Sequence, residues 1–551
     1  MEKFMCKNEV MGPILDKLGD RVVASSGIPS DRCHLGKLIF QSIKEDPDFV
    51  MQIDGRTGES ETNASVLRRS IQCATAFRNL GVNTGDVIVL MATNHLDQGI
   101  PLYAALYLGI ATATIDRTLL VGELESTFSN LQPKMIFCQS EKVLDVQKAT
   151  SQAGLNTKII SFDATPYAMS FSEMMQTYGE DIDVNDFKLA DFDPQETIAY
   201  LVSTSGTTGL PKSAIVTHMN MAVGGKYIFT LAKQFPPVQS VLIVAPLQWL
   251  SALINYVMGP IFNYGRIQSS APNTNEHILE LIQKYKPKFI ISSPPMMAAL
   301  MKAAPKVNCD FSCFDMIYLG GSAVPPEMID ELKRLNPKAV VTDVYGMSEV
   351  GSLALSNKIS SAGSCGKPMS HIKYKFVDVD TGEEVTEPYK RGELWIQTPG
   401  YFKGYYNNPE ATAEVLTEDK WFKTGDMMYR DEEWNFFFVE RIKLLLKYKN
   451  HQISPVELEA VIRQHPGVLD VAVTSLTHPD DGELPVACVV QRPGFEVTAD
   501  EIKNLVKENL TDTKQLRGGV MFLKELPLTT STKVHRRKLK ELVAAKRNEL
   551  L

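Results

Sequence analysis

Short runs of β-branched and apolar residues recur from about residue 60 to 350, with longer amphipathic stretches between them. This alternation is typical of parallel β-strands joined by crossover helices. We therefore predict an α/β fold whose large N-terminal part consists of layered, parallel-rich sheets with helices. The expected strands are Asp86–Ala92, Lys134–Cys138, Lys158–Phe162, Thr197–Val202, Lys288–Ile291, Met316–Leu319 and Ala339–Val344.

The most membrane-like stretch is Val241–Phe262, and it is interrupted by Pro246, Gln248, Ser251 and Asn255. Polar groups of this kind are costly in hydrocarbon, which disfavours a membrane-spanning helix. We expect a buried strand followed by a helix, and no transmembrane segment.

The pattern changes after about residue 365. Tyr374–Val379, Gly392–Gln397 and Asn435–Val439 have the alternation of antiparallel strands, and turn residues occur at Asp380–Gly382 and Asp431–Glu433. This part is predicted to be a β-rich subdomain of the large domain.

The last part of the chain mixes short helices with short strands in a compact α+β pattern. A charged turn at Glu440–Lys443 precedes it, so we predict a large domain over residues 1–440 and a small C-terminal domain over residues 444–551. The expected elements of the small domain are Pro455–Gln464, Val468–Val473, Pro485–Gln491, Ala499–Glu508 and Val520–Phe522.

Composition places the chain among ordinary globular proteins. It has 551 residues, of which 44% are hydrophobic and 22% charged, and this excludes whole-chain disorder and small disulfide-stabilised folds. The net charge of −8 and the pI near 5.7 argue against a protein that mainly binds nucleic acid. Small anions remain possible ligands.

The eight cysteines are scattered and the N-terminus has no basic-then-apolar leader, so we expect a reducing intracellular compartment. Only Cys309 and Cys313 are close together, and no histidine cluster accompanies them, so a metal or redox site is disfavoured there. The terminal tripeptide is not of the Ser-Lys-Leu type, which leaves cytoplasm and peroxisome both open.

The strongest chemical signal is a loop rich in hydroxyl groups that follows the strand expected to end at Val202. Glycines allow close approach of the backbone to a ligand, hydroxyl and N–H groups donate to phosphate oxygens, and a lysine adds positive charge. Leu210 and Pro211 distinguish it from the usual nucleotide P-loop. The residues expected to contact phosphate are Ser203, Thr204, Ser205, Gly206, Thr207, Thr208, Gly209 and Lys212.

This loop resembles the phosphate loop of the acyl-adenylate-forming enzymes, which include acyl-CoA synthetases, coumarate:CoA ligases and beetle luciferases. Six further motifs are similar to those of the family and occur in the same order, so the resemblance extends from about residue 35 to 545. They are Gly320–Pro325, Tyr345–Glu349, Gly404–Tyr405 with Asn408–Glu410, Trp421–Asp426, Arg441–Lys443 and Thr529–Lys533.

The resemblance implies a ligase that uses ATP, Mg²⁺ and coenzyme A, with a small-molecule carboxylic acid as its substrate and no nucleic-acid partner. It implies that Lys533 stabilises charge at the α-phosphate, with Ser348 and Glu349 as further catalytic residues and Glu349 as the magnesium ligand. The residues it places at the nucleotide are Gly321, Ser322, Ala323, Tyr345, Gly346, Met347, Asp426 and Arg441, with Asp426 at the ribose and Tyr345 against adenine.

For the second half-reaction, the resemblance implies that a mobile C-terminal domain rotates about a hinge at residues 441–443. Lys447 and Lys449 would then face coenzyme A. Without the resemblance, these two lysines read as part of a solvated surface.

Three departures from the family pattern stand out. Gln248 and Trp249 replace paired histidines, and an aromatic residue at the mouth of an acyl tunnel favours an apolar acid, either fatty or aryl. Thr532 stands where glycine usually precedes the catalytic lysine, and Asn450 replaces another common glycine.

Two other functions stay open beside the ligase. One is a luciferase-like oxidoreductase, although Gly224 lies where beetle luciferases carry an arginine. The other is a nucleotide-binding relative that has lost turnover, for which Thr532 is the main argument. The sequence leaves the acid and the oligomeric state undetermined.

Overall fold

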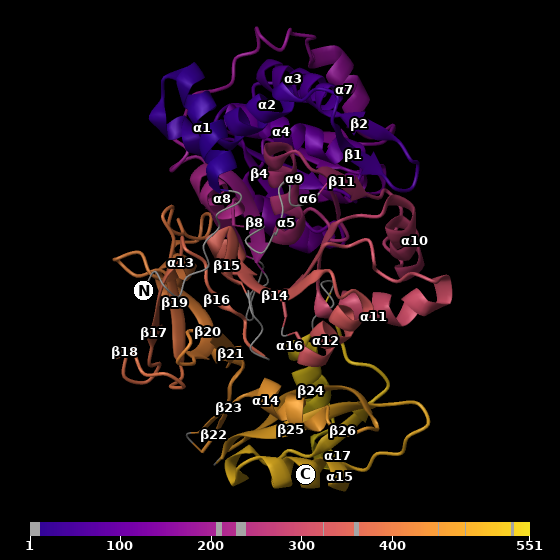
Figure 1. Cartoon of the computed structure of the whole chain (residues 1–551), viewed down its shortest axis with the longest axis vertical. Helices are drawn as coiled ribbons and strands as arrows, with labels where there is room; N and C mark the ends of the chain where they lie inside the picture. The colour runs from indigo at the N-terminus through magenta and orange to yellow at the C-terminus, as the bar shows by residue number, and fades with distance from the viewer. Residues whose placement is uncertain are drawn as a thin grey trace. The chain divides into compact units, whose positions relative to one another are not determined.

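The computed structural model describes residues 12–204, 212–227, 239–322, 324–356, 363–449, 451–479, 481–529 and 534–550 (Figure 1). Its internal contacts divide the chain into two compact units. The first comprises Met1–Tyr374 with Ile396–Lys423, and the second Lys375–Trp395 with Thr424–Leu551. The hinge predicted at residues 441–443 falls within the second unit and stays a prediction.

One sheet of the first unit has seven strands in the order β7-β6-β5-β3-β4-β8-β9. Neighbouring strands are parallel except β8 and β9, which form an antiparallel hairpin. The central strands β3 and β5 are buried at every residue, as continuous apolar runs in a covered parallel sheet should be. The strands are β3 (Val87–Met91), β4 (Ala111–Thr114), β5 (Met135–Cys138), β6 (Lys158–Ser161), β7 (Met169–Ser170), β8 (Ile198–Thr204) and β9 (Lys212–Thr217).

The other sheet of this unit has nine strands in the order β16-β15-β14-β13-β12-β10-β11-β1-β2. It is parallel from β14 to β1 and antiparallel at both margins. The strands are β1 (Val50–Asp54), β2 (Ser60–Thr62), β10 (Ser240–Leu242), β11 (Gly265–Gln268), β12 (Phe289–Ser292), β13 (Met316–Gly320), β14 (Val340–Met347), β15 (Ser352–Ser356) and β16 (Lys367–Pro368).

Two apolar helices, α4 (Gly99–Leu108) and α9 (Leu250–Phe262), contribute to the largest core of the first unit. All ten residues of α4 are buried, as expected of a helix that is apolar on every side. Its Tyr103 belongs to the same core as Ile88 of one sheet and Val241 of the other, so a single core joins the two sheets.

The remaining helices of the first unit flank the sheets, with α10, α11 and α12 to one side of β14 in Figure 1. They are α1 (Gly12–Ser26), α2 (Leu35–Glu45), α3 (Asn63–Asn79), α5 (Val121–Leu131), α6 (Val143–Gln152), α7 (Phe171–Tyr178), α8 (His218–Gly225), α10 (Asn275–Tyr285), α11 (Pro294–Ala303), α12 (Pro326–Leu335) and α13 (Pro409–Val415).

Two further sheets lie wholly or mainly in the second unit. Their orders are β18-β17-β19-β20-β21 and β23-β22-β25-β24, with β26 beside β25. The strands are β17 (Lys373–Val377), β18 (Glu384–Val385), β19 (Gly392–Gln397), β20 (Phe422–Arg430), β21 (Phe436–Arg441), β22 (Leu446–Tyr448), β23 (His451–Ile453), β24 (Val468–His478), β25 (Gly482–Gln491) and β26 (Val520–Leu523).

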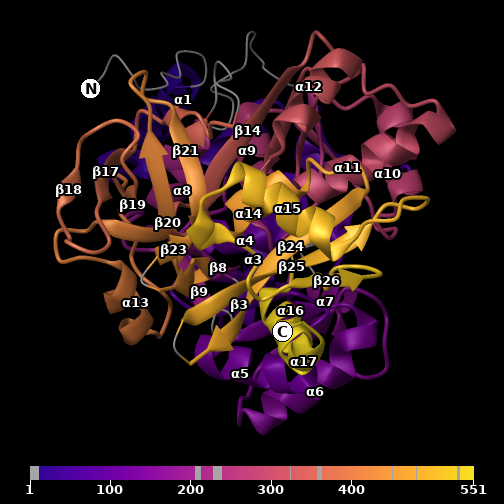
Figure 2. The same ribbon diagram turned by 90° about the horizontal axis from the view of Figure 1, so that it is seen from below.

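Helices cover both faces of the β24–β25–β26 sheet (Figure 2). Val471 faces a core with α14 (Pro455–Ile462) and α15 (Ala499–Asn509), whereas its neighbour Ala472 faces a core with α16 (Arg536–Ala545). This alternation follows from the two-residue period of a strand. A short helix, α17 (Arg547–Leu550), follows α16.

The predicted fold class is confirmed, and each strand expected between residues 60 and 350 is present. The strand and helix expected within Val241–Phe262 are also present as β10 and α9. Helix α16 was not predicted. Leu539 and Val543, four residues apart, are fully buried and hold this helix on the sheet.

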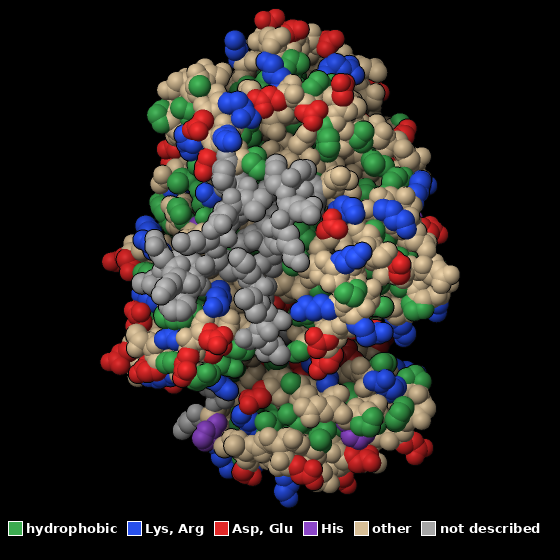
Figure 3. All heavy atoms as spheres, in the orientation of Figure 1, with side chains coloured by type: hydrophobic (Ala, Val, Ile, Leu, Met, Phe, Trp, Pro, Cys, Tyr) green, Lys and Arg blue, Asp and Glu red, His purple; other side chains and the backbone are tan. Residues whose placement is uncertain are grey.

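None of the helices in the described ranges has the length and apolarity needed to cross a bilayer. On the face shown in Figure 3, acidic and basic side chains are interspersed.

Candidate nucleotide and acid site

Three of the predicted segments meet at one edge of the nine-stranded sheet. Gln248–Trp249 follow β10, Gly321–Ser322 follow β13, and Tyr345–Met347 complete β14. These strands are parallel, with Gly320 opposite Val344, so their carboxyl ends face the same side. Ligands of open α/β sheets bind at such an edge.

The loop after β13 turns sharply at Gly321, whose φ is +87°, in the region that favours glycine. Ser322 is exposed there, and Ala323 lies outside the described residues. In the neighbouring strand Tyr345 is half-buried and Gly346 exposed, with an irregularity in the pairing to β15 between them. The loop after β13 and the last residues of β14 therefore present backbone and side-chain groups to solvent at the sheet edge.

Glu349 lies directly after β14 in a three-residue 3₁₀ turn, Ser348–Val350. The hydroxyl of Tyr405 donates a hydrogen bond of 2.8 Å to Oε1 of Glu349. Tyr405 is itself held by a bridge to Ala214 of β9 and by a hydrogen bond of 2.9 Å from its backbone N–H to Thr412. The candidate metal ligand is thus oriented by a residue 56 positions away in the sequence.

The phosphate loop lies at the tip of the β8–β9 hairpin. Ser203 pairs with Ser213 and Thr204 with Lys212, whose carbonyl accepts a 3.1 Å hydrogen bond from the Thr204 hydroxyl. These contacts hold the two stems of the loop side by side. The tip residues Ser205, Gly206, Thr207, Thr208 and Gly209 lie outside the described residues.

Lys212 connects this hairpin to Glu349. Its Nζ lies 5.2 Å from the centre of the Tyr405 ring and 3.9 Å from the carboxylate of Glu414. A cation over an aromatic face is favourable, and the same ring carries the hydroxyl that binds Glu349. We call these three residues the Lys212–Tyr405–Glu349 cluster. Tyr405 was expected only as part of the motif Gly404–Tyr405, and no local signal connected it with Glu349.

Glu349 offers the kind of ligand that Mg²⁺ takes, a carboxylate oxygen. Oε1 of Glu349 accepts from Tyr405, and among the described residues its second oxygen has no partner. No group of three or more His, Cys, Asp or Glu side chains in the described ranges could hold a metal by itself. Magnesium commonly uses one or two carboxylates together with substrate phosphates, so a single glutamate here is sufficient.

Gln248 and Trp249 lie at the start of α9, both half-buried. Trp249 occupies the N-cap position, and its carbonyl accepts hydrogen bonds of 3.0 Å from the N–H groups of Ala252 and Leu253. A cavity of about 10 Å³ lies between β10, β12 and α9, room for one water molecule. The role of Trp249 as a gate stays a prediction.

The predicted ribose ligand lies in the second unit. Asp426 is fully buried, and its Oδ1 lies 2.6 Å from Nε of Arg441, the residue opposite it in the β20–β21 pair. The structure therefore joins two predicted nucleotide-binding residues directly. Half of the Arg441 side chain is exposed, so one side of the pair faces solvent.

The two lysines predicted at coenzyme A are both exposed. Lys447 lies in β22, and its backbone N–H donates to Glu483. Lys449 follows with its Nζ 3.2 Å from Asp481, and the hydrogen bond to that carboxylate raises the pKa of Lys449. Lys533, Thr532 and Asn450 lie outside the described residues.

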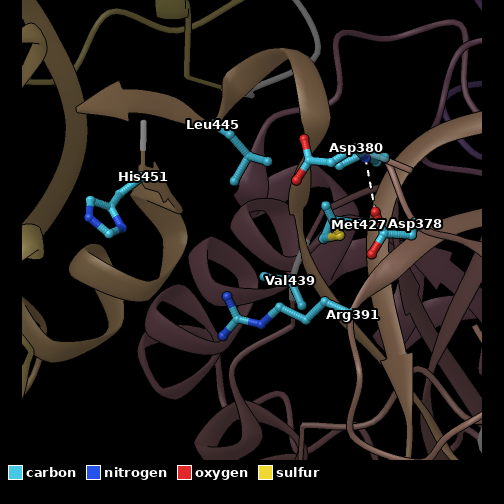
Figure 4. Close-up of a pocket in the computed structure, with 8 residues that line it drawn as sticks. Asp378, Asp380, Arg391, Met427, Val439, Leu445 and His451 are labelled. Atoms are coloured by element: carbon cyan, nitrogen blue, oxygen red, sulfur yellow. Dashed lines mark hydrogen bonds between the residues drawn. The ribbon is translucent and has the colours of Figure 1, made fainter. Parts of the chain in front are cut away.

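The second unit also contains a cavity of about 320 Å³ beside the predicted hinge (Figure 4). Met427 of β20, Val439 of β21 and Asp380 of the turn after β17 line it. Leu445 and His451, which follow residues 441–443, line its other side. None of the predicted site residues lines this cavity.

Two family models match the chain. Residues 39–406 match the family model of AMP-binding enzymes, and residues 457–533 match the AMP-binding enzyme C-terminal domain. The chain is 31% identical to luciferin 4-monooxygenase of Photinus pyralis, over 90% of this chain and 92% of that protein. It is 30% identical to 4-coumarate–CoA ligase 1 of Arabidopsis thaliana, over 92% of each.

Among solved structures, ATP-bound MatB from Rhodopseudomonas palustris superposes with a TM-score of 0.82. It is 21% identical, and the match covers 92% of this chain and 98% of that one, which shows a common fold. Since the family model covers well over half of the chain, this protein belongs to the AMP-binding family of adenylate-forming enzymes.

Proposed function

We propose that this protein is an ATP-dependent acid–thiol ligase. It would activate a fatty or aryl carboxylic acid as the acyl-adenylate and transfer the acyl group to coenzyme A. Family membership supports adenylate formation, and the similarity to a 4-coumarate–CoA ligase supports transfer to the thiol.

The Lys212–Tyr405–Glu349 cluster is the observation that carries the proposal. It places one cation and one carboxylate at the base of a loop with five hydroxyl residues. In the first half-reaction, a substrate carboxylate oxygen forms a bond to the α-phosphorus, and the bond to pyrophosphate breaks. Negative charge gathers on the phosphoryl oxygens, so cations and hydrogen-bond donors in fixed positions lower the barrier.

The roles of the remaining residues follow from their chemistry. Lys533 would bring a positive charge to the α-phosphate, and Glu349 would hold Mg²⁺, which neutralises phosphate charge when bound. Tyr345 would offer an aromatic face to adenine, and the carboxylate of Asp426, buried beside the half-exposed Arg441, would accept from the ribose hydroxyls. In the second half-reaction, the thiol attacks the acyl carbonyl and AMP leaves. Lys447 and Lys449 would face the incoming coenzyme A.

Acid-dependent release of pyrophosphate tests the proposal. Purified protein is incubated with ATP, Mg²⁺ and a panel of medium-chain, long-chain and cinnamate-like acids, and the thioester products are identified by mass spectrometry with coenzyme A present. We expect release with at least one acid, and a loss of about 10³-fold in Lys533→Met. Absence of release across the panel, or full activity of Lys533→Met, would refute the ligase.

Oxidation of a luciferin is the second candidate, because the Photinus enzyme is as similar to this chain as the coumarate ligase. One contact argues against it. A Cβ at Gly224 would lie 2.4 Å from Cβ of Ser352, so an arginine in this position has no room without displacement of β15. Photon counting with luciferin, ATP and oxygen decides between the two. Nucleotide binding without adenylate formation would instead indicate an inactive relative.

Cytoplasm and peroxisome are both proposed as locations. Fluorescence microscopy of the tagged chain beside a peroxisomal marker distinguishes them.

A further inference from the structure

Two neighbouring stems of the second unit flank residues 530–533 in the chain. Leu528 and Val534 form an antiparallel bridge, and the N–H of His535 donates to the carbonyl of Pro527 at 2.7 Å. The two chain segments on either side of residues 530–533 are therefore held side by side.

Arg536, three residues after Lys533, anchors one of these stems. Its Nη1 donates to Oε1 of Glu459 at 2.8 Å and to the carbonyl of Val473 at 2.6 Å. The same Glu459 oxygen accepts from the N–H of Val473 at 2.8 Å. One guanidinium is thus bound to helix α14 and strand β24 together.

Burial of Glu459 makes its carboxylate dependent on Arg536. Glu459 is 4% exposed, and a buried carboxylate needs a cation and hydrogen-bond donors in fixed positions. Arg536 is the near cation, since Nη2 of Arg463 is 3.9 Å from the other carboxylate oxygen. The helix that starts at Arg536 is fixed in turn by Leu539 and Val543, which are fully buried against the sheet.

We propose that Glu459 and Arg536 are positioning residues for Lys533. They hold in place the stem that follows Lys533 in the chain, and they do not touch substrate. The inference rests on the proposed function, in which Lys533 acts only during adenylate formation. Misplacement of a catalytic group by about 1 Å costs about 100-fold in rate, so a small shift of the stem has a measurable effect.

Measuring the two half-reactions separately distinguishes a positioning role from a general loss of stability, because only a positioning role affects adenylate formation alone. Adenylate formation is followed by exchange of labelled pyrophosphate into ATP with the most active acid of the panel. Thioester formation is followed separately, from the prepared adenylate of that acid and coenzyme A. In Glu459→Gln we expect adenylate formation to fall at least 10-fold, with thioester formation within about twofold of the unchanged protein.

Glu457→Gln is the matched control, because Glu457 lies on the same helix and its carboxylate is 2.5 Å from Nζ of Lys514. We expect this variant to keep both half-reactions within about twofold. If Glu459→Gln does not fold, Arg536→Lys replaces it, because lysine keeps the charge and loses the paired donors.

If Glu459→Gln or Arg536→Lys reduces the rates of both half-reactions equally, or reduces neither rate, the positioning role is overturned. Failure of the proposed function looks different: Lys533→Met then retains adenylate formation, or no acid supports it in the unchanged protein.

Discussion

The hydroxyl of Tyr405 donates to the carboxylate of Glu349 at 2.8 Å, and the ring of the same tyrosine lies 5.2 Å from Nζ of Lys212. One aromatic side chain therefore contacts both the candidate metal ligand and the lysine that follows the phosphate loop. Because only 9% of Tyr405 is exposed, its position is set by packing rather than by solvent.

Replacing Glu349 with glutamine is expected to reduce acyl-adenylate formation about 100-fold, since the amide no longer carries the charge that holds Mg²⁺. Tyr405→Phe removes only one hydrogen bond to a charged group, so we expect a loss of about 10-fold. Pyrophosphate release measured over a range of Mg²⁺ concentrations provides the readout.

Tyr406→Phe is the matched control for this pair, because the neighbouring tyrosine has no side-chain hydrogen bond within the described part of the chain. A Glu349→Gln enzyme with unchanged rate and unchanged Mg²⁺ dependence would remove Glu349 from the mechanism.

Asp426→Asn is expected to raise the KM for ATP about 10-fold, because the amide offers ribose one acceptor in place of two. Arg441→Met leaves the ribose ligand but removes its 2.6 Å cation, so the free energy of unfolding should fall by about 2 kcal/mol. Initial rates against ATP concentration and urea unfolding measure the two effects. Arg391 is exposed and precedes β19, so Arg391→Met should change neither the KM for ATP nor the free energy of unfolding. Equal KM values in Asp426→Asn and the unchanged protein would contradict the assignment.

Trp249→Ala is expected to raise the KM for an apolar acid about 10-fold and to leave the KM for ATP unchanged, because burial of an aromatic side chain contributes about 2 kcal/mol. Competition among acids of different chain length shows whether selectivity broadens at the same time. Trp434→Ala, which removes a tryptophan stacked on Arg430 in the second unit, serves as the control. If Trp249→Ala instead changed the KM for ATP and left the KM for the acid unchanged, Trp249 would be assigned to the nucleotide site.

Stability should fall in mild acid because of buried histidines in the first unit. Burial lowers the pKa of His34 to about 4 and that of His371 to about 3, against an ordinary value of 6.5. As the pH falls below about 6.5, the unfolded chain binds protons that the folded chain does not, so stability declines until the folded pKa is reached. Between pH 7 and pH 5 each such histidine should cost about 2 kcal/mol, measured by urea unfolding.

His34→Gln tests the assignment, since this histidine is fully buried and bonds to the carbonyl of Ala190 at 3.0 Å. The variant should lose less stability than the unchanged protein on going from pH 7 to pH 5. His451→Gln, an exposed position, should leave that difference as it is. Identical pH dependence in all three proteins would show that another group controls the acid transition.

Local pattern was enough to predict much of the fold. The predicted strands Thr197–Val202 and Met316–Leu319, observed as β8 and β13, are short apolar runs. Their short length and their β-branched and aromatic residues distinguish them from helices. The helix Arg536–Ala545 was not predicted, although its buried residues Leu539 and Val543 are four positions apart, the spacing of one helix face. The order of strands in the sheets could not be predicted from local pattern. β8 pairs with β4, for example, and the paired residues are far apart in the chain.

The sequence by itself determined the chemistry of this protein: the order of its loops, the hydroxyl-rich segment around Thr204 and the family to which it belongs. Such features depend on residue type and local spacing. Only the tertiary structure decided which groups contact one another, as in Tyr405 with Glu349, Asp426 with Arg441, and Glu459 with Arg536. Their contacts join residues far apart in sequence, and packing of whole sheets and helices, rather than any local propensity, brings them within hydrogen-bond distance.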